Sequence, residues 1–272
     1  MAPPSREITG HTRLLAIVAD PIHHVQTPQR INVLVRAHGI DAVMVPMHVG
    51  PDQLATVMNA LRHVGNFDGC VVTVPHKTGA LQFCDEVSAT ARLVGAVNVV
   101  HRLPDGRLRG GMLDGVAFVD GLRGAGIDVA GMSVYLAGAG GAACAIAFAL
   151  AESGVRGLTV ANRSTDKARD LVARVRSVHP QLEIAIGSAD PSGHDLVVNA
   201  TSLGLRAGDP LPLDVSRLAP SQTVAEIIMD PADTALLIEA RARGCRVHEG
   251  APMLASQIPR MAAFMLGLEQ PP

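Results

Sequence analysis

One stretch of the sequence decides the fold: Ser133-Val134-Tyr135-Leu136-Ala137, followed by Gly138-Ala139-Gly140-Gly141-Ala142-Ala143. The first five residues predict a strand because they are mostly apolar or aromatic and end at a glycine. The glycines predict a tight turn, and residues 141–153 predict a helix. A strand, a glycine-rich turn and a helix in this order are typical of a dinucleotide-binding unit.

The small residues of this turn have separate roles in that interpretation. Gly138 permits the tight turn, Gly140 allows backbone amides to approach a pyrophosphate, and Ala143 allows the helix to pack closely on the strand. The helix N-terminus then offers unpaired N–H groups and a partial positive charge to the phosphates. The expected cofactor contacts in this turn are Gly138, Ala139, Gly140, Gly141 and Ala142.

The end of the next expected strand distinguishes NAD from NADP. An NAD site usually has an acidic residue about 20 residues further on, where it binds the ribose hydroxyls. Here the sequence is Asn162-Arg163-Ser164-Thr165, with Lys167 close behind. No carboxylate would repel a 2′-phosphate, and several groups could bind one. These residues favour NADP over NAD; the alternative is a helix cap with solvated basic residues.

Short apolar runs alternate with helical patterns along the rest of the chain. The expected strands are 14–18, 43–47, 70–74, a hairpin of 96–102 and 107–110, 133–137, 158–161, 182–186, 196–199, 223–228 and 246–248. The expected helices are 27–38, with Thr27 as N-cap and Pro28 at N1, then 53–64, 78–83, 88–94, 116–123, 141–153, 164–177, 234–243 and 251–268. This alternation predicts two α/β domains, rich in parallel strand pairs, with a cleft between them. We expect residues 1–113 with 250–272 to form one domain, and residues 114–249 the dinucleotide-binding domain.

The composition argues against two classes of partner. The chain has 272 residues, with 23 basic and 25 acidic side chains and 2% aromatic residues. Nucleic-acid binders need a basic surface or rings on which bases stack, so nucleic acid is not an expected partner. The uncharged stretch 129–151 is long enough to span a membrane, but its glycines favour a strand, a turn and a buried helix instead.

The cysteines and histidines do not predict disulfides or metals. Four cysteines stand far apart without a Cys-x-x-Cys pair, which favours a reducing cytoplasm. Residues 1–12 have mixed charge and no apolar run, so no signal peptide is expected there. His23, His24 and His76 suggest a metal site, but no second cluster of ligands accompanies them and we expect none.

A hydride transfer between an alcohol and a nicotinamide also needs a group that transfers a proton. Lys77 is the leading candidate because Thr73-Val74-Pro75-His76-Lys77 places it just past the end of an expected strand. Asp114, on the loop that enters the second domain, could orient both the lysine and a substrate hydroxyl. Burial would lower the pKa of Lys77 and a nearby carboxylate would raise it, so its direction stays open. The alternative for Lys77 is an ordinary surface lysine.

Several ordered motifs carry a family resemblance. They are Pro21-Ile22-His23-His24 with Thr27-Pro28, the segment 73–77, Gly95-Ala96-Val97-Asn98, Asp114-Gly115, the glycine turn, Asn162-Arg163-Ser164, Asn199-Ala200-Thr201-Ser202 and Gln257. With these motifs the chain resembles the shikimate dehydrogenases of the shikimate/quinate dehydrogenase family over nearly its whole length. The resemblance implies an N-terminal substrate domain and a C-terminal Rossmann domain that binds NADP. It also implies reversible hydride transfer between NADPH and 3-dehydroshikimate, in aromatic amino acid biosynthesis.

The resemblance further implies the roles of single residues. Lys77 and Asp114 would be the catalytic pair. The implied substrate contacts are Thr27, Thr73, Asn98 and Gln257, with Val25 and Met229 beside them. The implied cofactor contacts beyond the glycine turn are Asn162, Ser164, Thr201, Ser202 and Gly250, with Arg163 and Lys167 on the 2′-phosphate.

Departures from the family pattern gather around the substrate carboxylate. Val25 and Met229 stand where the family has a serine and a tyrosine that hold it, and Val71 and Met112-Leu113 replace further polar residues. Each lost charge-strengthened hydrogen bond would cost about 1.5–3 kcal/mol. Three interpretations stay open: shikimate as the substrate, quinate or another cyclic alcohol that depends less on a carboxylate, or a non-catalytic dinucleotide-binding regulatory protein. The oligomeric state is open too, with a homodimer among the options.

Overall fold

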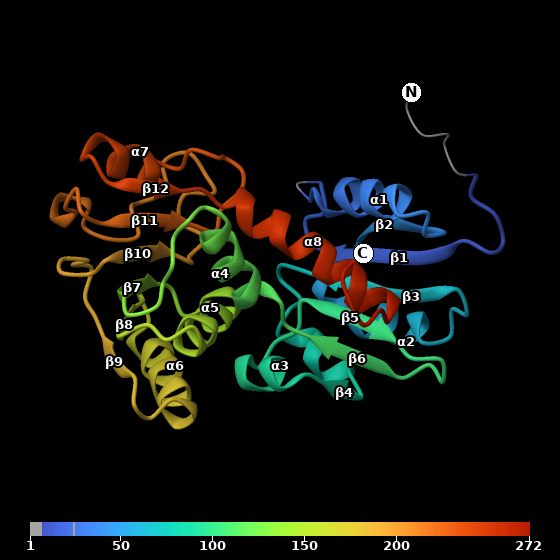
Figure 1. The fold of residues 1–272 in the computed structure, drawn as a ribbon. Helices are drawn as coiled ribbons and strands as arrows, with labels where there is room; N and C mark the ends of the chain where they lie inside the picture. The colour runs from blue at the N-terminus through green and yellow to red at the C-terminus, as the bar shows by residue number, and fades with distance from the viewer. Residues whose placement is uncertain (1–6, 24) are drawn as a thin grey trace. The chain divides into compact units, whose positions relative to one another are not determined.

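The computed structural model describes residues 7–23 and 25–272 and divides into two compact units. Unit 1 comprises Met1–Leu113 and Gln257–Pro272, and unit 2 comprises Asp114–Ser256. Each unit contains a six-stranded sheet with helices on its faces (Figure 1). The boundary after Ser256 falls inside the last helix, α8 (Ala251–Leu266).

Unit 1 contains a mixed sheet with the strand order β2-β1-β3-β5-β6-β4. Its strands are β1 (Arg13–Ala19), β2 (Ala42–His48), β3 (Phe67–Val72), β4 (Glu86–Val87), β5 (Val99–Arg102) and β6 (Leu108–Gly111). β1 pairs in parallel with β2 and β3, and β4 with β6. β5 runs antiparallel to both β3 and β6, so the start of β5 lies at the same edge as the end of β3.

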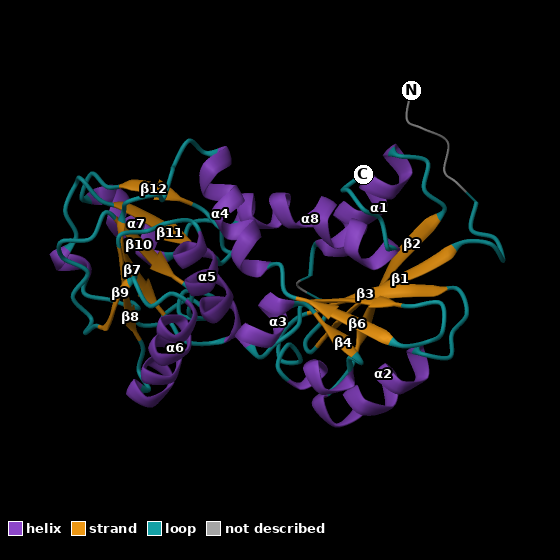
Figure 2. Cartoon of the chain, turned by 60° about the horizontal axis from the view of Figure 1, so that its bottom comes forward, coloured by secondary structure: helices purple, strands orange, loops and turns teal. Residues whose placement is uncertain are grey.

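Helices cover both faces of this sheet. They are α1 (Thr27–Ala37), α2 (Leu54–Leu61), α3 (Ala89–Val94) and the C-terminal part of α8, with short 3₁₀ turns at Pro51–Gln53 and Gly79–Phe83. In Figure 2, α2 lies on the opposite side of the sheet from α8. Two glycines let α8 approach closely: a Cβ at Gly69 would lie 3.1 Å from Met265 Cα, and one at Gly111 would lie 2.7 Å from the Phe264 ring.

Unit 2 contains a sheet in which every described strand pair is parallel. Its strands are β7 (Ser133–Ala137), β8 (Gly157–Ala161), β9 (Glu183–Ile186), β10 (Leu196–Asn199), β11 (Thr223–Glu226) and β12 (Arg246–His248). Its helices are α4 (Asp114–Gly124), α5 (Gly141–Glu152), α6 (Thr165–Val178) and α7 (Ala235–Ala242), besides the start of α8 and a 3₁₀ turn at Val215–Arg217. The order β9-β8-β7-β10-β11-β12 is the 3-2-1-4-5-6 order of a Rossmann fold, with its switch point between β7 and β10.

The core of unit 2 follows from the strand register. Tyr135, Val197 and Val224 are opposite one another on β7, β10 and β11, and all three are fully buried. They pack in one cluster with Leu236 and Leu237 of α7. The Tyr135 hydroxyl is satisfied because it donates to Ser188 O at 2.8 Å.

Some elements differ from the sequence-based expectations: the strand expected at 70–74 is β3 at Phe67–Val72, and the helix expected at 78–83 is the 3₁₀ turn Gly79–Phe83. Three further details concern single residues. Thr27 is the first residue of α1 rather than its N-cap; the N-cap is Gln26, whose side chain makes no capping hydrogen bond. α4 begins at Asp114, so this residue is in a helix and not on a loop; a carboxylate suits the first turn because it faces the positive helix end. β11 ends at Glu226 and not at 228, since the Glu226 carboxylate accepts the next two backbone N–H groups.

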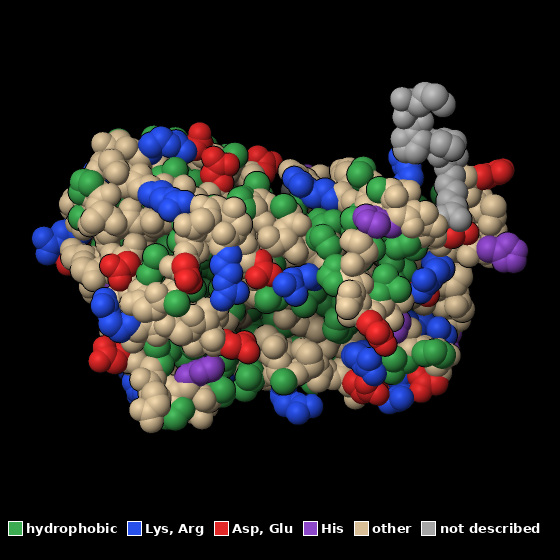
Figure 3. All heavy atoms as spheres, in the orientation of Figure 1, with side chains coloured by type: hydrophobic (Ala, Val, Ile, Leu, Met, Phe, Trp, Pro, Cys, Tyr) green, Lys and Arg blue, Asp and Glu red, His purple; other side chains and the backbone are tan. Residues whose placement is uncertain are grey.

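The described surface mixes charges of both signs. On the face drawn in Figure 3, acidic and basic side chains are interspersed rather than gathered into an area of one sign. Within the described residues, no helix has the length and apolarity that a membrane crossing requires.

Candidate functional site

The glycine turn lies at the switch point of the unit 2 sheet, where ligands bind in open α/β folds. Gly138 follows β7 directly and has a φ of 120°, and a Cβ there would lie 2.8 Å from Ala200 O. Both the backbone conformation and this close approach therefore require glycine. Gly140 differs, because a Cβ there would meet no described atom within 4 Å. Packing within the chain does not require glycine at 140, whereas a phosphate that approaches the start of α5 would.

The start of α6 provides two cations beside the same turn. Arg163 and Lys167 are exposed, and neither forms an ion pair with a described residue. The carboxylate between them, Asp166, is bound by Arg169 at 2.6 Å. Asn162 Nδ2 donates to Ser164 O at 2.9 Å, which fixes the bend between β8 and α6. The arrangement suits a phosphate group and offers no free acidic side chain for ribose hydroxyls.

The residues after β10 form a closed turn on the other side of the switch point. Thr201 is half-buried and Ser202 is exposed. The Thr201 amide and hydroxyl both donate to Asn199 Oδ1, at 3.0 and 2.7 Å, and Thr201 Oγ1 accepts from Leu203 N at 3.0 Å. Ala200 N donates to Ala137 O at 2.8 Å, so this turn begins beside the glycine turn.

A buried carboxylate supports the turn after β10. Glu226 is fully buried and opposite Asn199 in the register of β10 and β11. Asn199 Nδ2 donates to Glu226 Oε2 at 2.9 Å. Burial raises the pKa of Glu226, while the hydrogen bonds that it accepts oppose that rise.

Two more of the expected residues lie near the carboxyl ends of β11 and β12. A Cβ at Gly250 would lie 2.3 Å from Ile228 O, so the chain after β12 passes close to the chain after β11. Met229 follows there and is 37% exposed, which leaves its side chain open to a ligand.

In unit 1 several of the expected residues lie at the end of the sheet where β3 ends and its neighbour β5 begins. Thr73 N donates to Val18 O at 3.1 Å, and Lys77 O accepts from Val97 N at 2.9 Å. Asn98, the residue after Val97, is 1% exposed, and its Oδ1 accepts from Leu113 N at 2.9 Å. Three separate segments thus meet at one edge of the sheet.

The other expected residues of unit 1 come from α1, α8 and the histidine-containing segments. Thr27 is buried in the first turn of α1, and Val25 before it is half-buried. Gln257 of α8 is 5% exposed. His76 is buried, with Nε2 2.7 Å from Val49 O. His23 is exposed, and His24 lies outside the described residues.

The expected catalytic pair is divided between the units. Lys77 is half-buried in unit 1, whereas Asp114 is 3% exposed and is the first residue of unit 2. Asp114 directly follows Leu113, the residue whose amide binds Asn98. Their pairing stays a prediction from the sequence.

The thiols offer little chemistry. Burial raises the pKa of Cys70 to about 12 and that of Cys84 to about 11, so both remain protonated near neutral pH. In the part of the chain that the structure describes, no group of three or more His, Cys, Asp and Glu side chains could hold a metal ion.

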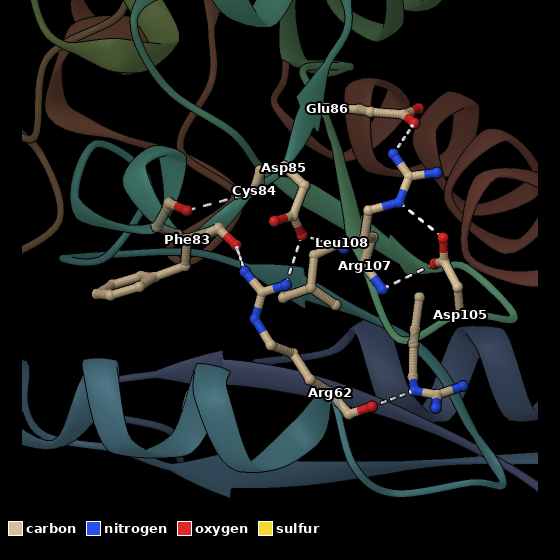
Figure 4. Close-up of polar contacts among 10 residues, drawn as sticks. Arg62, Phe83, Cys84, Asp85, Glu86, Asp105, Arg107 and Leu108 are labelled. Atoms are coloured by element: carbon tan, nitrogen blue, oxygen red, sulfur yellow. Dashed lines mark hydrogen bonds and ion pairs between the residues drawn. The ribbon is translucent and has the colours of Figure 1, made fainter.

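A second polar network lies in unit 1, around β4 and the start of β6 (Figure 4). Asp85 accepts from Leu108 N at 2.8 Å and pairs with Arg62. The Leu108 N–H, more than the guanidinium, holds the pKa of Asp85 below its usual range. Arg107 binds Glu86 at 2.8 Å. This network is largely exposed and lies at the opposite end of β6 from Leu113. We infer that it covers the edge of the sheet at β4 and is not part of the site.

Sequence patterns alone do not predict a role for Glu226 or the contacts of Asn199. Asn199 belongs to one of the family motifs, but the motif assigns it no contact. Glu226 lies inside the apolar run 223–228, which predicts only a strand. The available signal was a single carboxylate in an otherwise apolar strand, because acidic residues are almost never fully buried without a partner.

Comparison with known proteins identifies one family across both units. Residues 17–100 match the model of the shikimate dehydrogenase substrate binding domain, and residues 123–202 match that of shikimate / quinate 5-dehydrogenase. A shikimate dehydrogenase (NADP⁺) of Acidiphilium cryptum is 40% identical over 94% of this chain and 92% of its own length.

Solved structures have the same fold. Shikimate 5-dehydrogenase of Thermus thermophilus, in complex with NADP(H) and shikimate, gives a TM-score of 0.86 at 30% identity and covers 96% of this chain and 95% of its own. The ligand-free 5-ketofructose reductase of a Gluconobacter strain gives 0.84 at 29% identity, with 96% and 95% covered. The chain therefore belongs to the shikimate dehydrogenase family.

Proposed function

We propose that this protein is an NADP-dependent oxidoreductase that interconverts 3-dehydroshikimate and shikimate. The observation that carries the proposal is the match, over 94% of the chain, with a relative named shikimate dehydrogenase (NADP⁺). The protein's own residues support it through the glycine turn at the switch point and through two cations at the start of α6 that form no ion pair with a described residue. We include a cytoplasmic location in the proposal because the four cysteines are free.

The residues of unit 2 fit NADP. The N-terminus of α5, with Gly140 open to an approaching group, suits the pyrophosphate. Arg163 and Lys167 would hold the 2′-phosphate, and Thr201, Ser202 and Gly250 would lie along the rest of the dinucleotide. When bound, the dinucleotide supplies or accepts the hydride.

In this proposal the substrate belongs to residues 1–113 with 250–272 and the cofactor to residues 114–249, except that Gly250, at the junction of the two parts, contacts the cofactor. Thr27, Thr73, Asn98 and Gln257 would hold the substrate. The Asn98 side chain has a defined orientation, because its Oδ1 accepts a hydrogen bond from Leu113 N.

Lys77 would transfer the proton of the reacting hydroxyl. During reduction Lys77 Nζ gives a proton to the carbonyl oxygen as that oxygen becomes a hydroxyl, and during oxidation Nζ takes it back. The Asp114 carboxylate would accept hydrogen bonds from both Nζ and the hydroxyl, which orients the two groups.

The test is reduction of NADP⁺ and NAD⁺ with shikimate, quinate and a cyclic diol without a carboxylate. We expect saturable turnover of shikimate with NADP⁺ and a much higher KM for NAD⁺. Turnover of the diol but not of shikimate would assign another cyclic alcohol. Tight NADPH binding without turnover of any alcohol would make the protein a non-catalytic binder.

A further inference from the structure

The most unusual ionisable group outside the proposed catalytic pair is Glu226. It is fully buried at the end of β11, and it forms no ion pair with a described residue. A carboxylate without a cation is costly to bury unless donors satisfy its oxygens. Glu226 accepts hydrogen bonds from four donors, so hydrogen bonds rather than an ion pair stabilise its carboxylate.

The donors come from three segments. Oε1 accepts from Ile227 N at 2.9 Å and Ile228 N at 3.1 Å, in the loop after β11. Oε2 accepts from Asn199 Nδ2 at 2.9 Å, at the end of β10, and from Thr234 Oγ1 at 3.1 Å. Thr234 is also the N-cap of α7. One side chain thus joins the loops after β10 and β11 to the start of a helix.

The contact with Asn199 decides which way its amide points. Asn199 Nδ2 donates to Glu226 Oε2 and to Leu203 O, so Oδ1 must face the Thr201 amide and hydroxyl. Thr201 Oγ1 can then accept from Leu203 N. If the side chain at position 226 donated instead, Asn199 Nδ2 would lose this acceptor and the Asn199 amide would no longer be held in its orientation. The turn 199–203 would then lose several hydrogen bonds together.

This turn adjoins the glycine turn. The Cβ position of Gly138 lies 2.8 Å from Ala200 O, and Ala200 N donates to Ala137 O. A shift of residues 199–203 would therefore alter the surface at the switch point without touching the start of α6.

We propose that Glu226 is a positioning residue for the cofactor: through Asn199 it holds the turn 199–203 against the glycine turn, in the shape that the dinucleotide binds. The inference rests on the proposed function, since it assumes that NADPH binds at this switch point. Glu226 itself touches no ligand in this account.

The experiment measures NADPH dissociation constants, KM, kcat and thermal stability for the wild type and three variants. Glu226→Gln keeps the volume of the side chain but turns one acceptor into a donor. We expect NADPH to bind about tenfold more weakly, the lower end of what a charged hydrogen bond contributes, while kcat at saturating NADPH changes by less than about threefold.

Asn199→Asp combined with Glu226→Gln exchanges the donor and the acceptor. The amide introduced at position 226 can then donate to the carboxylate introduced at position 199, and that carboxylate still accepts from Thr201. We expect the double variant to recover a large part of the NADPH affinity, although Leu203 O loses its donor. Because its groups match again, the double variant also tests the proposal if Glu226→Gln alone does not fold.

Gln222→Met is the matched control. Gln222 is buried at the opposite end of β11, where it donates to Pro191 O and His194 O and accepts from Ala219 N. We expect this variant to lose stability with unchanged NADPH affinity. Glu226→Gln that lowers stability as Gln222→Met does, but leaves the NADPH affinity unchanged, would overturn the positioning role alone. A wild-type protein that does not bind NADPH would overturn the proposed function as well.

Discussion

The two units have sheets of equal strand number, but they assemble their expected site residues in different ways. In unit 2 every described pair is parallel, so the segments after β7, β8, β10 and β11 all leave from one edge. In unit 1, β5 runs antiparallel to β3, so Asn98, which precedes β5, joins Thr73, which follows β3.

This difference in strand direction determines which kind of ligand each sheet can bind. The parallel sheet aligns helix N-termini and glycine turns along one edge, which suits a long anionic ligand. The edge of the mixed sheet offers a buried amide, a threonine and a lysine from separate segments, which suits a small polar ligand. The proposed division, with proton transfer in unit 1 and cofactor affinity in unit 2, can be tested by substitutions in each unit.

The largest effect is expected from Lys77→Ala in unit 1. Loss of the proton-transfer group should lower kcat by about 10²–10⁴-fold, while the NADPH dissociation constant stays as in the wild type. Steady-state kinetics and fluorescence titration measure the two quantities. Thr78→Ala, an exposed neighbour, is the control. An unchanged kcat would remove Lys77 from the mechanism.

Arg163→Ala in unit 2 should have the opposite signature. Removal of a charged hydrogen-bond donor to the 2′-phosphate should weaken NADPH binding by about 10–100-fold, with little change in NADH binding or kcat. Arg176→Ala removes the same charge near the other end of α6, where the side chain donates to Ile184 O, and should leave both affinities unchanged. Equal losses for NADPH and NADH would disprove the phosphate assignment.

The two glycines of the unit 2 turn separate folding from binding. Gly138→Ala should lower the free energy of unfolding by about 1–3 kcal/mol, because of its φ of 120° and the nearby Ala200 O. Gly140→Ala has an ordinary φ and open space, so it should fold normally and lose only NADPH affinity. Denaturant unfolding and NADPH titration check both. A Gly140→Ala protein with full affinity would show that no ligand approaches this residue.

The same contrast explains what the sequence could predict. The strand, glycine turn and helix of 133–153 are contiguous, so local patterns located this part of the unit 2 site within a residue or two. The meeting of Lys77, Asn98 and Leu113 depends on strand pairing. Lys77 can be proposed from its place just past a strand and Asn98 from the family resemblance, but neither predicts the hydrogen bond between Leu113 and Asn98. Glu226 was missed because its partners, Asn199 and Thr234, become neighbours only when β10, β11 and α7 come together.

Glu226 also explains why β11 ends two residues earlier than the apolar pattern predicts. Its carboxylate binds the N–H groups of Ile227 and Ile228, which apolar periodicity had assigned to the strand. A side chain that competes for backbone donors ends a strand in a way that hydrophobicity does not reveal.

The smallest expected effects compare the polar networks of the two units through pH. Asp85 in unit 1 has a lowered pKa, so its contribution to stability is present above its unfolded pKa of about 3.9 and is lost as pH falls through the folded value. Glu226 in unit 2 has a raised pKa, so its contribution is present below its unfolded pKa of about 4.3 and is lost as pH rises through the folded value.

Urea unfolding of wild type, Asp85→Asn and Glu226→Gln between about pH 2 and about pH 7 tests these opposite signs, because the Asp85 contribution changes below its unfolded pKa of about 3.9. As pH rises, the wild type should gain stability relative to Asp85→Asn, by a small amount because Asp85 is partly exposed. Over the same range it should lose stability relative to Glu226→Gln, since the variant has no charge to bury. If both differences had the same sign, the donors around Glu226 would outweigh its burial, and the buried network of unit 2 would behave like the exposed network of unit 1.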